Sequence, residues 1–189
     1  MNDAAPAKLP GRLLVISGPS GSGKTSVVRD LRSDPRVTFS VSATTRPRRE
    51  GERDGVDYHF LDAAEFEARM ARGEFLETAR YNGNLYGTLR APMEQALRDG
   101  RTFVLEIEVQ GTRILRENGI PGLYVFLVPP NIDALRERLT RRGQNSPEEI
   151  DARVAIAAEE MRASHLYDHV IVNDDLARTI RAVREVAGL

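Results

Sequence analysis

Apolar runs alternate with amphipathic stretches along most of the chain. Four short apolar runs are typical of buried parallel strands, and they cover residues 13–17, 102–107, 123–128 and 169–172. Helical patterns lie around and between these runs, at residues 24–32, 92–98, 110–117, 131–142, 146–166 and 175–186. This order of elements predicts an α/β fold, with a parallel sheet as its core and helices on both faces.

The segment 39–90 departs from this alternation. One helical pattern, at 62–72, lies among four short strand-like runs at 39–42, 58–61, 75–81 and 84–89. Short strands around one helix indicate a small mixed α/β lobe, inserted between core segments 11–38 and 91–189 of a single domain.

Two helices carry clear signals at their ends. Asp62 stands at an N-cap position with Glu65 three residues later, and Gly73 follows the last turn. Ser146 is followed by Pro147, and Glu149 completes a capping box. We therefore expect helices to begin at these two capping residues.

The basic residues are almost all arginine. Among 27 basic and 28 acidic residues there are only two lysines, Lys8 and Lys24, and the net charge is −1. A near-neutral chain is not typical of a nucleic-acid binder, which shows a basic excess over the whole domain. The absence of cysteine excludes disulfides, thiolate metal sites and a cysteine nucleophile.

The first ten residues are small, polar and proline-containing. They lack the apolar stretch of a signal peptide, and no apolar run in the chain approaches the length that spans a bilayer. We therefore expect a disordered leader over residues 1–10 on a cytoplasmic protein, with no membrane partner and no obligatory protein partner.

A phosphate-binding motif follows the first predicted strand. It fits the pattern G-x-x-x-x-G-K-[ST] and consists of Gly18, Pro19, Ser20, Gly21, Ser22, Gly23, Lys24 and Thr25. Its backbone amides converge on phosphate oxygens, the lysine bridges the β- and γ-phosphates, and the threonine hydroxyl ligates Mg²⁺. An ordinary glycine-rich turn is the alternative, but the required strand and helix flank this motif. The motif therefore predicts an ATP site.

The segment 42–58 is dense in arginine and hydroxyl side chains. Guanidinium groups grip phosphate in a bidentate manner, and serine, threonine and tyrosine hydroxyls complete such a site. A solvated loop of mixed charge is the alternative for an isolated arginine cluster. The nearby phosphate-binding motif favours a second phosphate site.

In its motifs the chain resembles the guanylate kinase family. The resemblance rests on the segments 17–21, 42–46, 49–52, 55–60, 73–77, 84–88, 106–111, 138–143 and 172–174, and it extends over residues 11–187. It implies a P-loop kinase fold in which the inserted lobe binds GMP and a short helical lid, over residues 140–153, closes on ATP. One departure is that Glu106 and Glu108 stand where the family has aspartates.

The resemblance also implies roles for individual residues. The GMP site consists of Ser42, Arg46, Arg49, Tyr58, Glu77, Tyr86, Thr88 and Glu108. Within it, the two arginines and two tyrosines hold the phosphate, and Glu77 accepts from the N1–H and amino group of guanine. Glu106 is assigned to Mg²⁺ through water, although which of Glu106 and Glu108 contacts guanine and which the metal water stays open.

On the donor side, the resemblance assigns Arg138 and Arg142 to the ATP phosphates and Asn173 to the adenine end. The catalytic residues it implies are Lys24, Arg46, Arg142 and Arg153. Basic residues that end a helix favourably are the alternative for the arginines around residue 140.

The predicted reaction is phosphoryl transfer from ATP to GMP, and to dGMP, giving ADP and GDP with Mg²⁺ as cofactor. Its nucleophile is an anionic phosphate oxygen, so no general base is required. Two alternatives remain: a phosphopeptide-binding domain of the guanylate-kinase-like type found in scaffold proteins, and a kinase for another nucleoside monophosphate. The intact phosphate-binding motif argues against the first.

Overall fold

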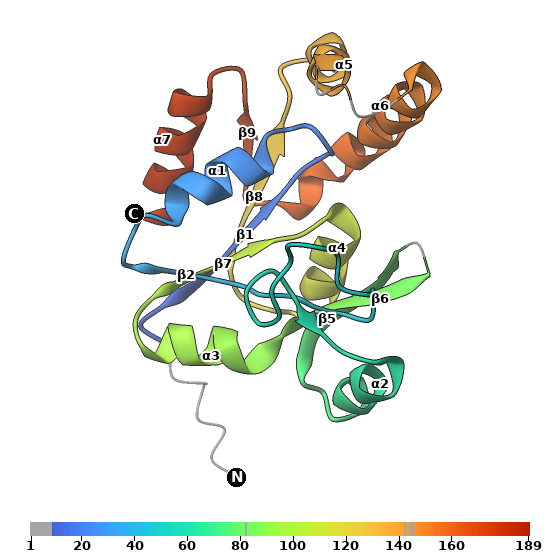
Figure 1. Ribbon diagram of the computed structural model, residues 1–189. Coiled ribbons are helices and arrows are strands. Elements are labelled where there is room, and N and C mark those ends of the chain that lie inside the picture. The colour runs from blue at the N-terminus through green and yellow to red at the C-terminus, as the bar shows by residue number, and fades with distance from the viewer. Residues whose placement is uncertain (1–8, 82, 142, 144–145) are drawn as a thin grey trace.

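A computed structural model describes residues 9–81, 83–141, 143 and 146–189 of the chain. Its core is a sheet of five parallel strands (Figure 1). In spatial order these are β2 (Val37–Phe39), β7 (Thr102–Glu106), β1 (Arg12–Ser17), β8 (Leu123–Val128) and β9 (His169–Val172). The predicted parallel α/β core is confirmed. Residues 1–8 of the predicted leader lie outside the described residues.

Alternate side chains of the strands point to opposite faces of this sheet, and helices cover both faces. Leu13 and Val15 pack with α3 (Arg90–Arg98) and α4 (Val109–Glu117). Leu14 and Ile16 pack with α1 (Lys24–Leu31) and α7 (Leu176–Ala187) on the other side. The four β1 side chains are at most 1% exposed, so the strand that leads into the phosphate-binding motif is held by apolar packing on both faces.

Both outer strands of the sheet differ from expectation. The predicted strand at 39–42 was wrong: β2 ends at Phe39, and it belongs to the core sheet because Val37 and Phe39 align with Thr102 and Val104 of β7. The strand at 169–172 forms as predicted but is not buried. It lies at the sheet edge, where Val170 and Val172 are each 49% exposed.

The inserted segment forms a second, four-stranded sheet, which confirms the mixed character of the lobe. Its spatial order is β4 (His59–Phe60), β3 (Ala43–Thr44), β6 (Asn84–Leu89) and β5 (Phe75–Tyr81). Helix α2 (Ala63–Ala71) packs on it through the stacked rings of Phe66 and Phe75, whose centroids are 4.5 Å apart. Asp62 caps this helix by accepting from the Glu65 N–H at 2.8 Å, as the sequence predicts.

Two further helices pack against each other beyond the carboxyl end of β8. They are α5 (Ile132–Arg141) and α6 (Pro147–Met161), which share the apolar residues Leu135, Leu139, Ile150, Val154 and Ala157. The capping box at Ser146 is confirmed, and a 3₁₀ helix (Arg162–Leu166) follows α6. Among the described residues, no helix combines the length and apolarity needed to cross a bilayer.

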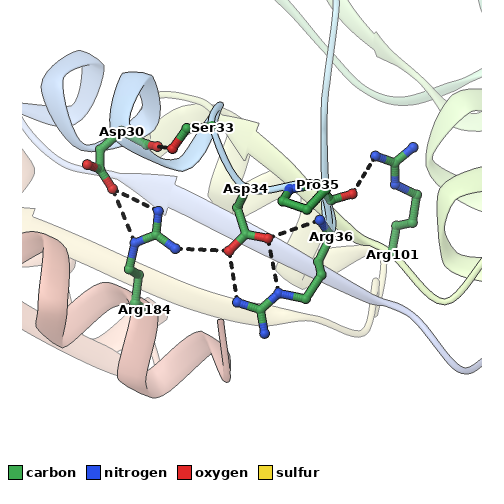
Figure 2. Close-up of polar contacts among 7 residues, drawn as sticks. All are labelled: Asp30, Ser33, Asp34, Pro35, Arg36, Arg101 and Arg184. Atoms are coloured by element: carbon green, nitrogen blue, oxygen red, sulfur yellow. Dashed lines mark hydrogen bonds and ion pairs between the residues drawn. The ribbon is translucent and has the colours of Figure 1, made fainter.

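A network of ion pairs joins α7 to the end of α1 (Figure 2). Arg184 donates to Asp30 at 3.0 Å and to Asp34 at 2.9 Å. Asp34, whose side chain is 7% exposed, also accepts from the Arg36 side chain at 2.8 and 3.0 Å and from its backbone N–H. The hydrogen bonds from Arg36, with a smaller contribution from Arg184, hold the pKa of Asp34 well below its usual range.

We predict that Asp34→Asn lowers the stability of the protein at pH 7 and that this loss shrinks at acidic pH. The pKa of Asp34 is depressed in the folded state. Its stabilising contribution is therefore fully present above the unfolded-state pKa of about 3.9 and is lost progressively as the pH falls from there toward the depressed folded-state pKa. Urea unfolding midpoints measured at pH 7 and pH 2.5 check this.

The exposed Glu67, substituted by glutamine, serves as the control and should shift the midpoint little at either pH. An Asp34→Asn midpoint equal to wild type at pH 7 would contradict the role of the network.

Candidate functional site

The phosphate-binding loop runs from the end of β1 to the start of α1. Its three glycines adopt positive φ angles, and at Gly23 (φ 99°) the backbone lies so close to Asn173 that a Cβ atom would be 2.1 Å from the Asn173 Nδ2. The Lys24 ammonium donates to the carbonyls of Gly18 at 2.5 Å and Pro19 at 3.2 Å. The loop thus joins a strand to a helix, and the lysine folds back over it.

Thr25 and Glu106 meet across the loop. The Thr25 hydroxyl, in the first turn of α1, donates to Glu106 Oε1 at 3.1 Å, and Glu106 is the last residue of β7. A hydroxyl and a carboxylate are the hard oxygen donors that Mg²⁺ takes, while it keeps several of its own waters. The two side chains therefore fit the predicted metal position.

A cavity of about 610 Å³ extends from this loop to the second sheet. At one end it is lined by Lys24 and Thr25, and at the other by Tyr58, Glu77 and Tyr86. Ser42, Glu106 and Glu108 also line it. The structure thus brings most of the predicted acceptor residues together with the phosphate-binding lysine.

Glu77 lies buried in the wall of this cavity and is 8% exposed. Its Oε1 accepts the hydroxyl of Thr88 at 2.7 Å, because Glu77 on β5 is aligned with Thr88 on the antiparallel β6. Burial raises the pKa of Glu77, and the hydrogen bonds from Thr88 oppose this rise. On its other side, Oε2 lies 3.4 Å from where a Cβ of Gly111 would be.

Arg46 is held by a carboxylate that we did not single out from the sequence. Its Nη1 and Nη2 donate to the two oxygens of Glu52 at 3.1 and 2.7 Å, and Glu52 also accepts from the Arg49 N–H at 2.8 Å. The guanidinium lies 5.4 Å from the centroid of the Tyr58 ring, and the Tyr58 and Tyr86 rings meet edge to face. The side chain of Arg49 is exposed beside this cluster.

A second cavity, of about 320 Å³, opens on the other side of the loop. Gly21 and Gly23 line it together with Arg138 and Asn173, two of the predicted donor residues. Arg153 lies in α6 and lines neither cavity. Arg142 lies outside the described residues, so its predicted role is not placed by the structure.

Comparisons with known proteins agree with this arrangement. The family model described as guanylate kinase matches residues 10–187. The chain belongs to the guanylate kinase family. It is 50% identical over 180 residues to the guanylate kinase of Alkalilimnicola ehrlichii, covering 94% of this chain and 88% of that protein.

Two further relatives extend the comparison. The guanylate kinase of Symbiobacterium thermophilum is 46% identical over 182 residues, which cover 96% of this chain and 86% of that protein. The crystal structure of the guanylate kinase from Anaplasma phagocytophilum superposes with a TM-score of 0.73 at 33% identity, over 93% of this chain and 84% of that one.

Three side chains near the guanylate kinase motifs were missed from the sequence. Glu52 ends the Arg-x-Gly-Glu motif, so its place in that motif was an available signal. Glu160 of α6 gave no local signal, because only tertiary packing brings it to Ser20 of the loop. Thr179 of α7 contacts Asn173, which lies six residues before it in the chain. The Glu160 carboxylate interacts with the Ser20 N–H, and its burial together with the neighbouring Glu108 raises its pKa.

We predict that Gly111→Ala raises the KM for GMP severalfold without destabilising the fold. The added methyl would lie 3.4 Å from Glu77 Oε2 and 3.3 Å from Ile107 Cδ1, so the cavity wall narrows at the carboxylate. Because Gly111 is inside α4, alanine also favours the helix by up to about 1 kcal/mol. Steady-state kinetics and thermal unfolding check the two expectations separately.

The KM for ATP should stay within about twofold, because the substitution is remote from the loop amides. Glu117→Ala, an exposed position on the same helix, is the control. An unchanged KM for GMP would contradict the inferred crowding of Glu77.

Proposed function

We propose that the larger cavity binds GMP and that the phosphate-binding loop, with the smaller cavity beside it, binds ATP. As a guanylate kinase, the protein transfers a phosphoryl group from ATP to GMP and forms ADP and GDP. One observation carries the assignment of the two sites. A single cavity is lined by Lys24 and Thr25 at one end and by Glu77 and Tyr86 at the other.

Glu77 is the group that recognises guanine in this proposal. Guanine presents two adjacent donors, its N1–H and its amino group, which one carboxylate accepts together. Adenine has an unprotonated N1 there, so it would leave a buried carboxylate unpaired, at a cost of about 1–3 kcal/mol or more. The Ser42 and Thr88 hydroxyls lie beside O6, and dGMP is a second acceptor.

Arg46, Arg49, Tyr58 and Tyr86 hold the phosphate of GMP. The Glu52 pair with Arg46 supports this role, because it fixes a guanidinium beside two tyrosines before substrate arrives. A bidentate partner of this kind reduces the rotamer freedom that would be lost on binding. Glu108 contacts guanine.

Thr25 and Glu106 hold Mg²⁺, the threonine directly and the glutamate through water. Their 3.1 Å contact supports the assignment of Glu106 rather than Glu108 to the metal side. When bound with ATP, Mg²⁺ neutralises charge on the transferred phosphoryl group.

Catalysis consists of positioning and charge neutralisation. The GMP phosphate oxygen is already anionic, so the protein supplies cations rather than a base. When ATP binds, Lys24 exchanges the carbonyls of Gly18 and Pro19 for the ATP phosphates. As the segment 140–153 closes, the negative charge of the ATP phosphates is neutralised by Arg138, Arg142 and Arg153. Closure excludes water, which would otherwise hydrolyse ATP.

We predict that Lys24→Met or Arg46→Ala lowers kcat by a factor on the order of 10² or more, because each removes a cation from the transferring phosphates. Thermal unfolding should show that both variants remain folded. Arg181→Ala, which removes an exposed arginine of α7, is the matched control and should keep wild-type turnover. A Lys24→Met enzyme with near-wild-type kcat would contradict the assignment.

We predict that Glu77→Gln lowers kcat/KM for GMP by a factor on the order of 10², because the amide faces two guanine donors with one acceptor. ADP formation is measured side by side with GMP, dGMP, AMP and UMP. In wild type the KM for GMP should also rise as the pH falls through the raised pKa of Glu77, since only the carboxylate accepts both donors.

Glu77→Gln should lack this part of the pH dependence. Comparing the KM–pH profiles of the two enzymes separates the titration of Glu77 from that of the GMP phosphate. Preference of the wild-type enzyme for AMP over GMP would refute both the guanine assignment and the proposed function.

A further inference from the structure

The carbonyl of Ser22 in the phosphate-binding loop accepts a hydrogen bond from the side chain of the residue that follows β9. Asn173 donates from Nδ2 to this oxygen at 2.7 Å, across 151 residues of sequence. Both ends of the contact are buried, since Ser22 is 0% and Asn173 5% exposed. A buried carbonyl requires such a partner, because leaving it unpaired costs stability.

The carboxamide of Asn173 has a second partner, on helix α7. Thr179 of α7, which is 1% exposed, lies with its hydroxyl 3.1 Å from Asn173 Oδ1. The same hydroxyl is 2.9 Å from the Asp175 carbonyl and 3.5 Å from the Val172 carbonyl, so its one hydrogen is shared among three acceptors. Thr179 therefore favours the amide orientation that directs Nδ2 at the loop.

The backbone of Asn173 joins the other parts of the donor site. Its N–H donates to the Val128 carbonyl at 2.8 Å, and its carbonyl accepts from Arg138 Nη2 at 2.7 Å. The Nδ2 atom lies so close to the loop that any side chain at Gly23 would collide with it. One residue thus links the loop, the end of β8 and the arginine that faces the smaller cavity.

We infer that Asn173, oriented by Thr179, is a positioning residue that fixes the phosphate-binding loop in the shape that receives the triphosphate. The predicted contact of Asn173 with adenine is a different role, in which its carboxamide reads the base. The contacts favour the loop, because Nδ2 is engaged by Ser22 and Oδ1 faces Thr179. The inference rests on the proposed ATP site and adds which residues shape it.

Inorganic tripolyphosphate separates the two roles, because it carries the phosphates without a base. We expect Asn173→Ala to weaken the Kd for Mg²⁺-tripolyphosphate, measured calorimetrically, by about tenfold, which corresponds to about 1.4 kcal/mol. Thr179→Val, which keeps the shape and removes the hydroxyl, should weaken it by about threefold. Thr179→Ser restores the hydroxyl and should bind within about twofold of wild type.

Kinetics with two donors supply a second readout. ATP and ITP carry the same triphosphate but differ at the 6-position of the base. Because Asn173 acts through the loop and not on the base, Asn173→Ala should lower kcat/KM for both donors by the same factor. The KM for GMP should remain within about twofold of wild type in each variant. Val183→Ala, a buried truncation on the same helix that does not touch Asn173, controls for general destabilisation and should leave the tripolyphosphate Kd unchanged.

Loss of ATP affinity in Asn173→Ala with an unchanged tripolyphosphate Kd would overturn the inference in favour of an adenine contact. Equal weakening by Val183→Ala would overturn it in favour of nonspecific loosening. Should Asn173→Ala not fold, the Thr179→Val and Thr179→Ser pair decides by the same measurements. Failure of wild type to bind tripolyphosphate or to phosphorylate GMP would instead refute the proposed function.

Discussion

The parallel pairing of β1 with β7 and β8 is the interaction on which the site depends. Ile16 is aligned with Glu106, the last residue of β7, and Ser17, the last residue of β1, with Phe126, two residues before β8 ends. The three strands therefore end at the same edge of the sheet. The pairing of Val128 with Val172 brings β9 to the same edge. Ligands of open parallel sheets bind at this edge because loops from several strands converge there. Here the convergence gathers the phosphate-binding loop, two glutamates and Asn173.

In this structure three charged groups of the site already have partners within the protein. Arg46 is paired with Glu52, Lys24 donates to two loop carbonyls, and Glu77 accepts from Thr88. When ATP binds, Lys24 therefore exchanges loop carbonyls for phosphate oxygens, whereas Arg46 keeps Glu52 as the partner that orients it. Such exchange limits the net gain in affinity, but it keeps buried charges from being left uncompensated before the nucleotides arrive.

The sequence was sufficient to predict a feature where the residues that define it are neighbours in the chain. The motif from Gly18 to Thr25 is flanked by its strand and helix, and the Asp62 and Ser146 caps are formed as expected. The strands at the sheet edges were less predictable, because segments as short as 37–39 and 169–172 do not reveal which neighbours they pair with. The position of Glu160 beside Ser20 depended on packing between distant segments, and the role of Arg142 stays a prediction.

The tie between Ser22 and Asn173 has a consequence for how the protein is made. Ser22 leaves the ribosome 151 residues before Asn173. At typical rates of synthesis this interval is on the order of ten seconds. The Arg184 contact with Asp30 spans 154 residues and closes equally late. During that interval the Ser22 carbonyl lacks its hydrogen bond from Asn173, and α1 lacks its ion pair with Arg184. The donor site is therefore completed by a long-range closure, which is typically a slow step in the folding of parallel sheets.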